Sequence, residues 1–378
     1  MPLGLYLHFP FCTNKCAYCD FYKEVHDSEA EMRFFEALGI ETQMAAQDCG
    51  DDRELATIYI GGGTPSLANL NLLTDWFTQV KREFEVPRHL EFSFECNPES
   101  VTLELLETLA ATGVNRPIFG AQSFQPGLLK RLGRRHKLHD THRAVYLTNA
   151  LGFDNWGIDI IFGLPKQTGK LLSKDLIALT DLEPPHVSLY QLTVEPGTPL
   201  AEQVQAGRVK VPDDDLSFAL YSAGVEHLTK AGYARYEVSS FARPGHECQH
   251  NIGYWEGRDY LGLGPAAHSF MDGRRFANVS DLQEYIAALD RGQRPLRIDE
   301  SGIEARVTES IMLGLRTARG IDRRMFSDRF ECTVESKLRR ENIDILVKSG
   351  HLVSDDEGLR LTDDGFLVAD EIIQRLVR

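Results

Sequence analysis

From residue 3 to about residue 230, short β-prone runs alternate with longer stretches of amphipathic helical spacing. The six strand-like runs span residues 3–9, 56–62, 90–96, 116–122, 156–162 and 186–192. The helix-like stretches between and after them span residues 28–46, 69–84, 102–112, 139–150, 170–181 and 214–231. Alternation of this kind predicts an α/β fold, with a parallel sheet and helices outside it.

The strands mix polar and apolar residues, which is typical of a barrel whose interior faces a site. A complete barrel needs eight strand–helix units, and only six are evident. We therefore predict an incomplete, TIM-like (β/α)6 barrel, with an open doubly wound sheet as the alternative. In either architecture, ligands bind at the carboxyl ends of the strands.

The chain changes character after the last of these helices. We predict a barrel over 1–232, an extended aromatic-rich segment over 233–280 and a C-terminal domain over 281–378. The third region has three helix-like stretches and a hairpin-like "HLVSDDEGLRLT", which together resemble a winged-helix α+β module. Because the chain is acidic, we expect a structural or lid role for this module and no DNA binding.

Charge and cysteine content limit the function classes. Asp and Glu outnumber Lys and Arg by 56 to 41, which argues against general nucleic-acid binding. No apolar run reaches the roughly 18 residues of a membrane helix, and the N-terminus lacks the basic start of a signal peptide. Three of the seven cysteines lie within eight positions. We expect a cytoplasmic protein with reduced thiols.

The clustered thiols form a C-x3-C-x2-C motif just after the first predicted strand, at Cys12, Cys16 and Cys19. A structural zinc site usually has four ligands, and a dithiol redox motif needs two cysteines. Three thiolates on a four-iron cluster leave one iron open, and an open iron can chelate the amine and carboxylate of an amino acid. From the motif alone, zinc, chance and a cubane with a remote fourth ligand remain alternatives.

Polar or glycine residues mark the ends of the following strands. "GGG" at residues 61–63 ends the second strand and allows a ligand close to the backbone. Glu95 and Gln122 end the next two strands, Arg134 follows twelve residues later, and Asp159 lies inside an apolar strand. Each has an ordinary explanation, such as a tight turn or a solvated acid. Together they predict a ligand site at one edge of the sheet.

The cysteine motif is similar to that of the radical S-adenosylmethionine (SAM) superfamily, whose cluster cleaves SAM to a 5′-deoxyadenosyl radical. Further motifs resemble the oxygen-independent coproporphyrinogen III oxidase family, and best its heme-chaperone (HemW) branch. They are "LYLHFPFC", "GGGTPS", "GAQSF", "LGRRH", "IDIIFGLPKQT", "YEVSSFARPG", "CQHNIGYW" and "YLGLGPAAHS".

The resemblance implies three sets of site residues. The 4Fe–4S cluster would be held by Cys12, Cys16 and Cys19. SAM would be contacted by Tyr6, Phe21, Gly62, Gly63, Thr64, Glu95, Gln122, Arg134 and Asp159. Heme would be bound by the H-N-x-x-Y-W residues His250, Asn251, Tyr254 and Trp255, with Cys248, His246 and His268 as rival ligands.

Two functions follow from the resemblance. A heme chaperone would deliver heme to client hemoproteins, including respiratory cytochromes and membrane-associated enzymes, as a monomer able to dimerise. An oxidase would decarboxylate coproporphyrinogen III by radical chemistry. The oxidases carry a cysteine two positions after the third one, where this chain has Phe21, and this favours the chaperone. A radical enzyme with an unrelated substrate is a third possibility.

Two positions depart from the family pattern. Pro117 stands in a predicted strand where the family has an aliphatic residue, so we expect weakened strand pairing there. Ala266 replaces a glycine, so we expect a constrained loop.

Overall fold

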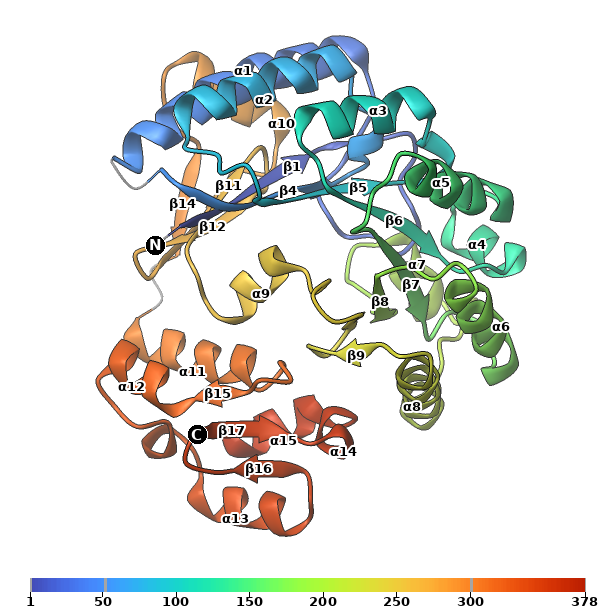
Figure 1. Ribbon diagram of the computed structural model, residues 1–378, viewed down its shortest axis with the longest axis vertical. Helices are drawn as coiled ribbons and strands as arrows, with labels where there is room; N and C mark the ends of the chain where they lie inside the picture. Colours follow the sequence, from blue (N-terminus) through green and yellow to red (C-terminus); the bar gives the residue numbers. More distant parts are fainter. Residues whose placement is uncertain (1, 51–52, 300–301, 378) are drawn as a thin grey trace.

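The computed structural model describes residues 2–50, 53–299 and 302–377. Six neighbouring parallel strands form the centre of one sheet, in an order that follows the sequence (Figure 1). They are β1 (Leu3–Phe9), β4 (Leu55–Gly62), β5 (Glu91–Cys96), β6 (Arg116–Gln122), β7 (Gly157–Phe162) and β8 (His186–Gln191). The predicted α/β fold is confirmed, and each strand begins and ends within one residue of the prediction.

Helices cover the outer face of these strands (Figure 1). They are α1 (Ser28–Asp48), α2 (Leu70–Glu83), α3 (Leu103–Thr112), α4 (Pro126–Leu132), α5 (Leu138–Ala150), α6 (Gly169–Thr180) and α8 (Asp214–Lys230), with the short α7 (Pro199–Gln205) before α8. Several start where a polar side chain accepts a backbone N–H, as Asp27 does for α1 and Thr102 for α3. The apolar faces of these helices join the sheet in one large core, except for α4 and α7, whose leucines form a smaller cluster with the end of β7.

The sheet continues beyond these six strands on both sides. Next to β1 lie the parallel β11 (Tyr260–Leu263) and the antiparallel β12 (His268–Met271), β13 (Arg274–Asn278) and β14 (Leu296–Asp299). Next to β8 lie β10 (Ser240–Ala242) and β9 (Ala234–Arg235). Among the described residues, the two outer strands do not pair with each other, so the barrel is incomplete, as predicted.

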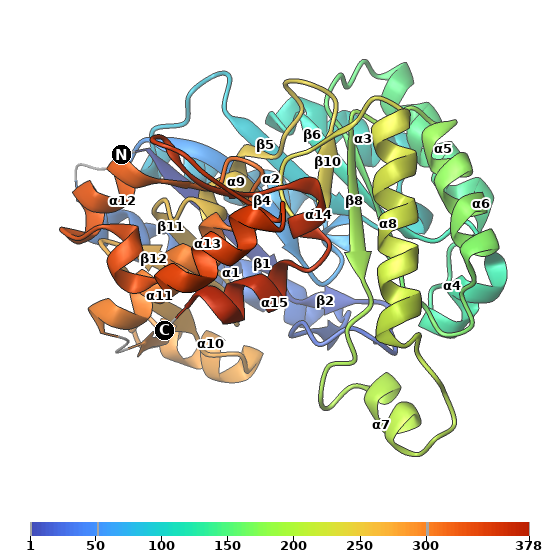
Figure 2. The same cartoon turned by 90° about the horizontal axis from the view of Figure 1, so that it is seen from below.

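We predicted a C-terminal domain over 281–378, and the residues of this range divide between two cores. Helix α10 (Leu282–Asp290) packs on α1, and its apolar residues belong to the first core. Strand β14 extends the main sheet by pairing with β13. A second core starts at Val307. It is built from α11 (Ile303–Gly314), β15 (Ile321–Asp322), α12 (Arg323–Phe330), α13 (Arg340–Lys348), β16 (Leu352–Ser354), β17 (Gly358–Leu361), α14 (Asp363–Phe366) and α15 (Ala369–Leu376) (Figure 2).

Pro117 does not break the pairing of β6. It is the second residue of the strand and stands opposite Phe94 of β5, while pairing with β7 begins one residue later, at Ile118. The missing N–H therefore falls before the β6–β7 ladder starts, where a proline costs least.

Ala266 has φ +61, in the left-handed region that favours glycine. Its N–H donates to the carbonyl of Val279 at 2.9 Å, so the surrounding loop holds it there. We expect Ala266→Gly to raise the free energy of unfolding by about 1 kcal/mol, because glycine adopts this conformation without strain. Chemical denaturation of the two proteins measures this difference, and an Ala266→Gly protein that is less stable than the wild type would contradict it.

Candidate functional site

A cavity of about 410 Å³ lies at the carboxyl ends of the parallel strands. This volume is in the range of small-molecule sites. Every residue predicted for the cluster and for SAM lines it except Tyr6: Cys12, Cys16, Cys19, Phe21, Gly62, Gly63, Thr64, Glu95, Gln122, Arg134 and Asp159. Residues from several strands thus meet at one edge of the sheet, as the sequence predicts.

The cysteine loop enters the cavity from β2 (Phe11–Cys12), which pairs with β3 (Glu24–Val25). Cys12 is buried and its Sγ accepts from the Thr64 hydroxyl at 3.3 Å, while Cys16 and Cys19 are half-buried. The loop is tied to the end of α4, where Ala17 N–H donates to the carbonyl of Leu132 at 3.2 Å. These contacts keep all three thiols on one wall.

The donor set fits an iron–sulfur cluster better than a single ion. No group of three or more His, Cys, Asp or Glu side chains within the described ranges is arranged to hold one metal ion. A four-iron cluster places each thiolate on a different iron, so its ligands need not converge on one point. Three half-buried or buried thiols around an open cavity meet that requirement and leave one iron for a ligand.

The glycine run at the end of β4 passes close to the cysteine loop. Gly63 N–H donates to the carbonyl of Phe9 at 2.7 Å, and a Cβ at Gly63 would stand 2.5 Å from the carbonyl oxygen of Phe11. Gly62 has φ +104. A side chain is therefore excluded at Gly63 by backbone contacts and at Gly62 by the His8 ring and the positive φ. The cavity wall here is peptide backbone that a polar ligand can approach.

Two carboxyl groups face the cavity from β5 and β7. Burial raises the pKa of Glu95 to about 7, against a lowering effect of the Tyr59 hydroxyl that donates to it at 2.8 Å, and Asp159 raises the pKa further. Burial likewise raises the pKa of Asp159 to about 6. A positively charged ligand between them would favour both ionised forms, and SAM carries a sulfonium and an ammonium group.

Gln122 and Arg134 complete the cavity wall. The β6–β7 register shifts between Gly120 and Gln122, and Gln122 has φ +63, so this bulge turns its side chain at the strand end. Arg134 Nη2 donates to the carbonyl of Gly120 and to Asn97 Oδ1, both at 2.7 Å. These two bonds fix the guanidinium beside the Gln122 side chain.

Three buried polar atoms of residues that line the cavity make no hydrogen bond to the described residues: Asp159 Oδ1, Glu99 Oε2 and Arg134 Nε. Buried polar groups in native proteins are almost always hydrogen-bonded, so two such acceptors and one such donor on the same cavity suit a polar ligand. The residues present therefore fit both a three-cysteine cluster and SAM.

Tyr6 is not among the residues that line the cavity. Its hydroxyl is 3.2 Å from His8 Nδ1, and its ring packs against Tyr59. Sequence reasoning missed Tyr59 and Asn97, which hold Glu95 and Arg134 in place. Tyr59 was the detectable one, because it is a polar residue within the apolar strand "ATIYIGG".

The predicted heme motif forms α9 (Gln249–Trp255), which lies on the opposite face of the sheet from α1 and α2 (Figure 1). Glu91 of β5 accepts the backbone N–H groups of Gln249 and His250, both at 2.9 Å. A carboxylate on the first N–H groups of a helix satisfies donors that have no partner within the helix. The start of α9 is thereby fixed to the sheet.

His250 is buried, and both of its ring nitrogens are occupied. Nδ1 lies 2.7 Å from the Thr57 hydroxyl and Nε2 lies 2.7 Å from the Tyr254 hydroxyl. Burial lowers the pKa of His250 to about 3, and its ring stacks on Tyr59. We predicted His250 as the heme ligand, and in this arrangement both of its ring nitrogens are hydrogen-bonded within the protein.

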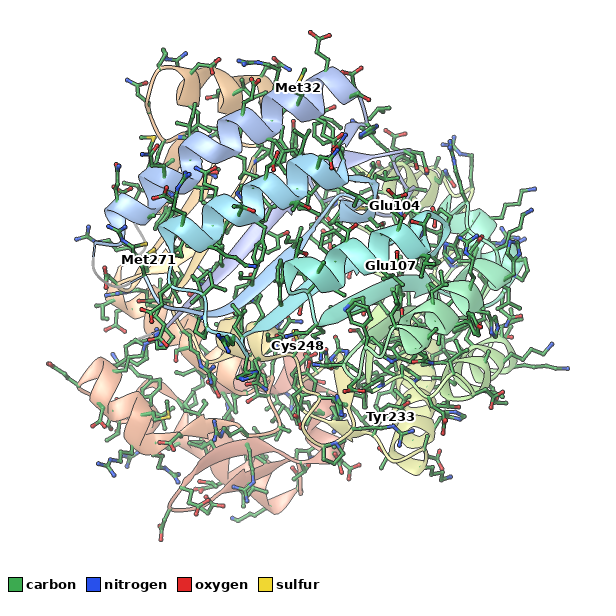
Figure 3. The ribbon with its side chains drawn as sticks, turned by 45° about the horizontal axis from the view of Figure 1, so that its top comes forward. Met32, Glu104, Glu107, Tyr233, Cys248 and Met271 are labelled. Atoms are coloured by element: carbon green, nitrogen blue, oxygen red, sulfur yellow. The ribbon has the colours of Figure 1, made fainter. Side chains whose placement is uncertain are left out.

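The other motif residues and rivals differ in access. Asn251, Tyr254 and Trp255 are half-buried on α9. Cys248, labelled in Figure 3, is fully buried, and burial raises its pKa to about 12, which keeps it a thiol. His246 is half-buried near Asn155, and His268 is exposed at the start of β12.

Comparisons with known proteins agree with this geometry. Residues 6–174 match the radical SAM superfamily and residues 304–368 match the HemN C-terminal domain. The fold resembles coproporphyrinogen III oxidase (HemN) from Escherichia coli, a radical SAM enzyme, with a TM-score of 0.85 and 24% identity over 99% of this chain and 89% of that one.

Two full-length relatives are heme chaperones. The HemW of Lactococcus lactis is 33% identical, over 100% of this chain and 97% of its own length. The HemW of Bacillus subtilis is 32% identical, over 97% of each chain. Membership of the radical SAM superfamily implies a 4Fe–4S cluster and SAM. On this similarity, the chain belongs to the HemW family of heme chaperones within the radical SAM superfamily.

Proposed function

We propose that this protein binds heme and transfers it to client hemoproteins, with a 4Fe–4S cluster and SAM in the cavity at the strand ends. The observation that carries the proposal is the position of the H-N-x-x-Y-W residues. They form a separate helix, α9, outside the residues that line the cofactor cavity. Cargo and cofactors then occupy different sites, which suits a carrier.

Within the cavity, we propose that Cys12, Cys16 and Cys19 ligate the cluster. Glu95, Gln122, Arg134 and Asp159 would contact SAM, and the glycine run would admit it to the backbone. A bound cluster would supply the electron for reductive cleavage of SAM. The residues of this chain orient the ligand and exclude water from it.

Phe21 has a proposed role at the cavity mouth. Its side chain is 64% exposed, which is unusual for a phenylalanine, and it follows the third cysteine by two positions. An apolar ring at this place would cover one side of the cofactors without offering a further thiol. The Phe21 side chain brings no hydrogen-bond donor and no charge to the cavity mouth.

On α9, we propose that Tyr254 and Trp255 present the surface that meets heme. His250 holds Tyr254 through the 2.7 Å bond, and Thr57 holds His250 in turn. For His250 itself to ligate iron, it would have to release Tyr254 and leave its buried position. We therefore assign it to positioning, with Asn251 beside it on the helix.

The oxidase is the second candidate, because the cofactor cavity contains all the residues expected for SAM cleavage except Tyr6. Anaerobically reconstituted protein separates the two functions. We expect hemin titration to give a saturable Soret band, and we expect no protoporphyrinogen from coproporphyrinogen III with reductant and SAM. Escherichia coli HemN is the positive control. Turnover at the rate of that control would overturn the proposal.

No helix in the described parts of the chain has the length and apolar character to cross a bilayer. We propose a cytoplasmic carrier whose clients include membrane-associated respiratory enzymes, and which is a monomer able to dimerise. Co-purification with a heme-free client before and after hemin addition tests the delivery step.

A further inference from the structure

A second hollow lies where α9 meets the C-terminal unit, away from the cofactor cavity. Its walls come from α9, from the β11–β13 region of the main sheet and from α11 and α12 (Figure 1). Tyr254 and Trp255, the last residues of the heme motif, line it. We refer to it as the arginine cleft, because Arg275, Arg306 and Arg329 also line it.

The arginine cleft carries an unbalanced positive charge. Its charged lining residues are three arginines and one acid, Glu309, which pairs with Arg275 at 2.7 Å. Within the described ranges, Arg306 and Arg329 are in no ion pair. Asp259 and Glu309 act on Arg329 only from beyond ion-pair distance. Two guanidinium groups without a directly paired carboxylate in one hollow are notable in a chain with a net charge of −15. They suit a ligand with two negative charges.

Backbone carbonyls hold these two arginines without neutralising them. Arg306 Nη1 donates to the carbonyl of Gly273 at 2.7 Å, and Arg329 Nη2 donates to that of Gly257 at 2.9 Å. A Cβ at either glycine would collide with the guanidinium, at 2.2 Å for Gly273 and 2.6 Å for Gly257. The positions of Arg306 and Arg329 therefore require glycine at 273 and 257, respectively.

Donors remain available on both side chains. A guanidinium has five N–H donors, and the Nε of Arg306 is buried without a partner among the described residues. Arg329 uses one donor from each terminal nitrogen on carbonyls and is itself exposed at the mouth. A carboxylate is the group that pairs best with such a fork.

Aromatic rings form the other walls of the cleft. Tyr254 packs edge-on against Tyr260 at 4.5 Å between ring centroids, and Phe270 continues the row. Phe330 lies on the side of α12. A row of aromatic rings beside the guanidinium groups of Arg306 and Arg329 suits a flat aromatic ligand that carries carboxylates on one edge.

We propose that the arginine cleft binds the carboxylate edge of heme, with Arg306 and Arg329 each taking one propionate and Tyr254 and Trp255 facing the porphyrin. The proposal rests on the proposed function and assigns its contact residues. The cleft measures about 250 Å³, below the usual range of sites that enclose a small molecule. It therefore holds one edge and leaves the rest of the macrocycle exposed for transfer.

Hemin and its dimethyl ester test the proposal on the full-length protein. The ester has the same macrocycle without the two negative charges. We expect wild-type protein to bind hemin at least tenfold more tightly than the ester in absorbance titrations. Arg329→Gln and Arg306→Gln should each weaken hemin binding by about tenfold and ester binding by less than twofold, as expected for a lost charge-assisted hydrogen bond.

Arg324→Gln is the matched control, since Arg324 lies on the same helix as Arg329 with a 93% exposed side chain and is not part of the cleft. It should leave both affinities unchanged. Arg329 is at the surface, so its variant tests the proposal even if Arg306→Gln does not fold. Equal hemin affinity in the wild type and Arg329→Gln would overturn the cleft assignment alone. Absence of hemin binding in the wild type would overturn the proposed function as well.

Discussion

Cys16→Ala is expected to reduce the iron and sulfide content of the reconstituted protein to less than a tenth of the wild-type value. Cys12, Cys16 and Cys19 are the proposed ligands, so the variant leaves two irons without a protein ligand. The fourth cysteine of the lining, Cys96, is buried on β5, and burial raises the pKa of its thiol, so we do not expect it to replace Cys16. Binding of SAM should fall with the cluster. Hemin binding should remain within twofold of the wild type, because α9 and the arginine cleft share no lining residue with the cavity. Iron analysis and the Soret titration on one preparation measure both.

The control for this variant is Cys49→Ala. Cys49 is half-buried like Cys16 and follows α1, away from the cavity. It should keep the full iron content. An intact cluster in Cys16→Ala would mean that the loop has been assigned wrongly. Loss of hemin binding together with iron would mean that the cargo site depends on the cluster.

The strand positions and the location of the cavity could be predicted from the sequence, because the alternation of strands and helices implies a parallel sheet. Carboxyl ends of parallel strands meet at one edge, so Glu95, Gln122 and Asp159 had to be near each other once their strands were parallel. These three residues do line one cavity. The same holds for Cys12, which follows the first strand directly.

Contacts between distant segments were not predictable in this way. The motif predicts His250 as a heme ligand, but one of its two ring hydrogen bonds is to Thr57, which lies 193 residues earlier in the chain. The arginine cleft joins residues of α9, β13, α11 and α12, and no local pattern marks Arg306 or Arg329 among the 41 basic residues. The placement of α10 and β14 likewise depends on tertiary contact, of α10 with α1 and of β14 with β13.

The carboxyl groups of the cavity should make the SAM-free protein less stable as the pH rises. Glu95 has a pKa of about 7 in the folded protein against an ordinary value of 4.5, so the folded state holds its proton more tightly than the unfolded state. Stability contributed by this proton is full below about pH 4.5 and is lost as the pH rises to 7. Asp159, with a pKa of about 6, acts in the same direction.

Glu95→Gln should therefore be more stable than the wild type at pH 8, by on the order of 2–3 kcal/mol, and nearly equal at pH 4.5. The amide oxygen can still accept from Tyr59, so the packing is retained. The same variant should bind SAM at least tenfold more weakly, because the neutral amide does not attract its positive charges. Urea unfolding without SAM at the two pH values, and calorimetric SAM titration of reconstituted protein, measure the two effects.

Glu104→Gln is the matched control, because Glu104 is exposed on α3 (Figure 3) and should change neither quantity. A wild-type stability that stays constant from pH 5 to pH 8 would show that Glu95 and Asp159 ionise freely in the empty cavity. A Glu95→Gln protein that is less stable at pH 8 would show that the carboxylate supports the fold. Glu95→Gln is thus expected to raise the stability of the SAM-free protein and to weaken SAM binding. Both effects together follow only if the fold holds the Glu95 carboxylate buried, at a cost in stability, in order to bind SAM.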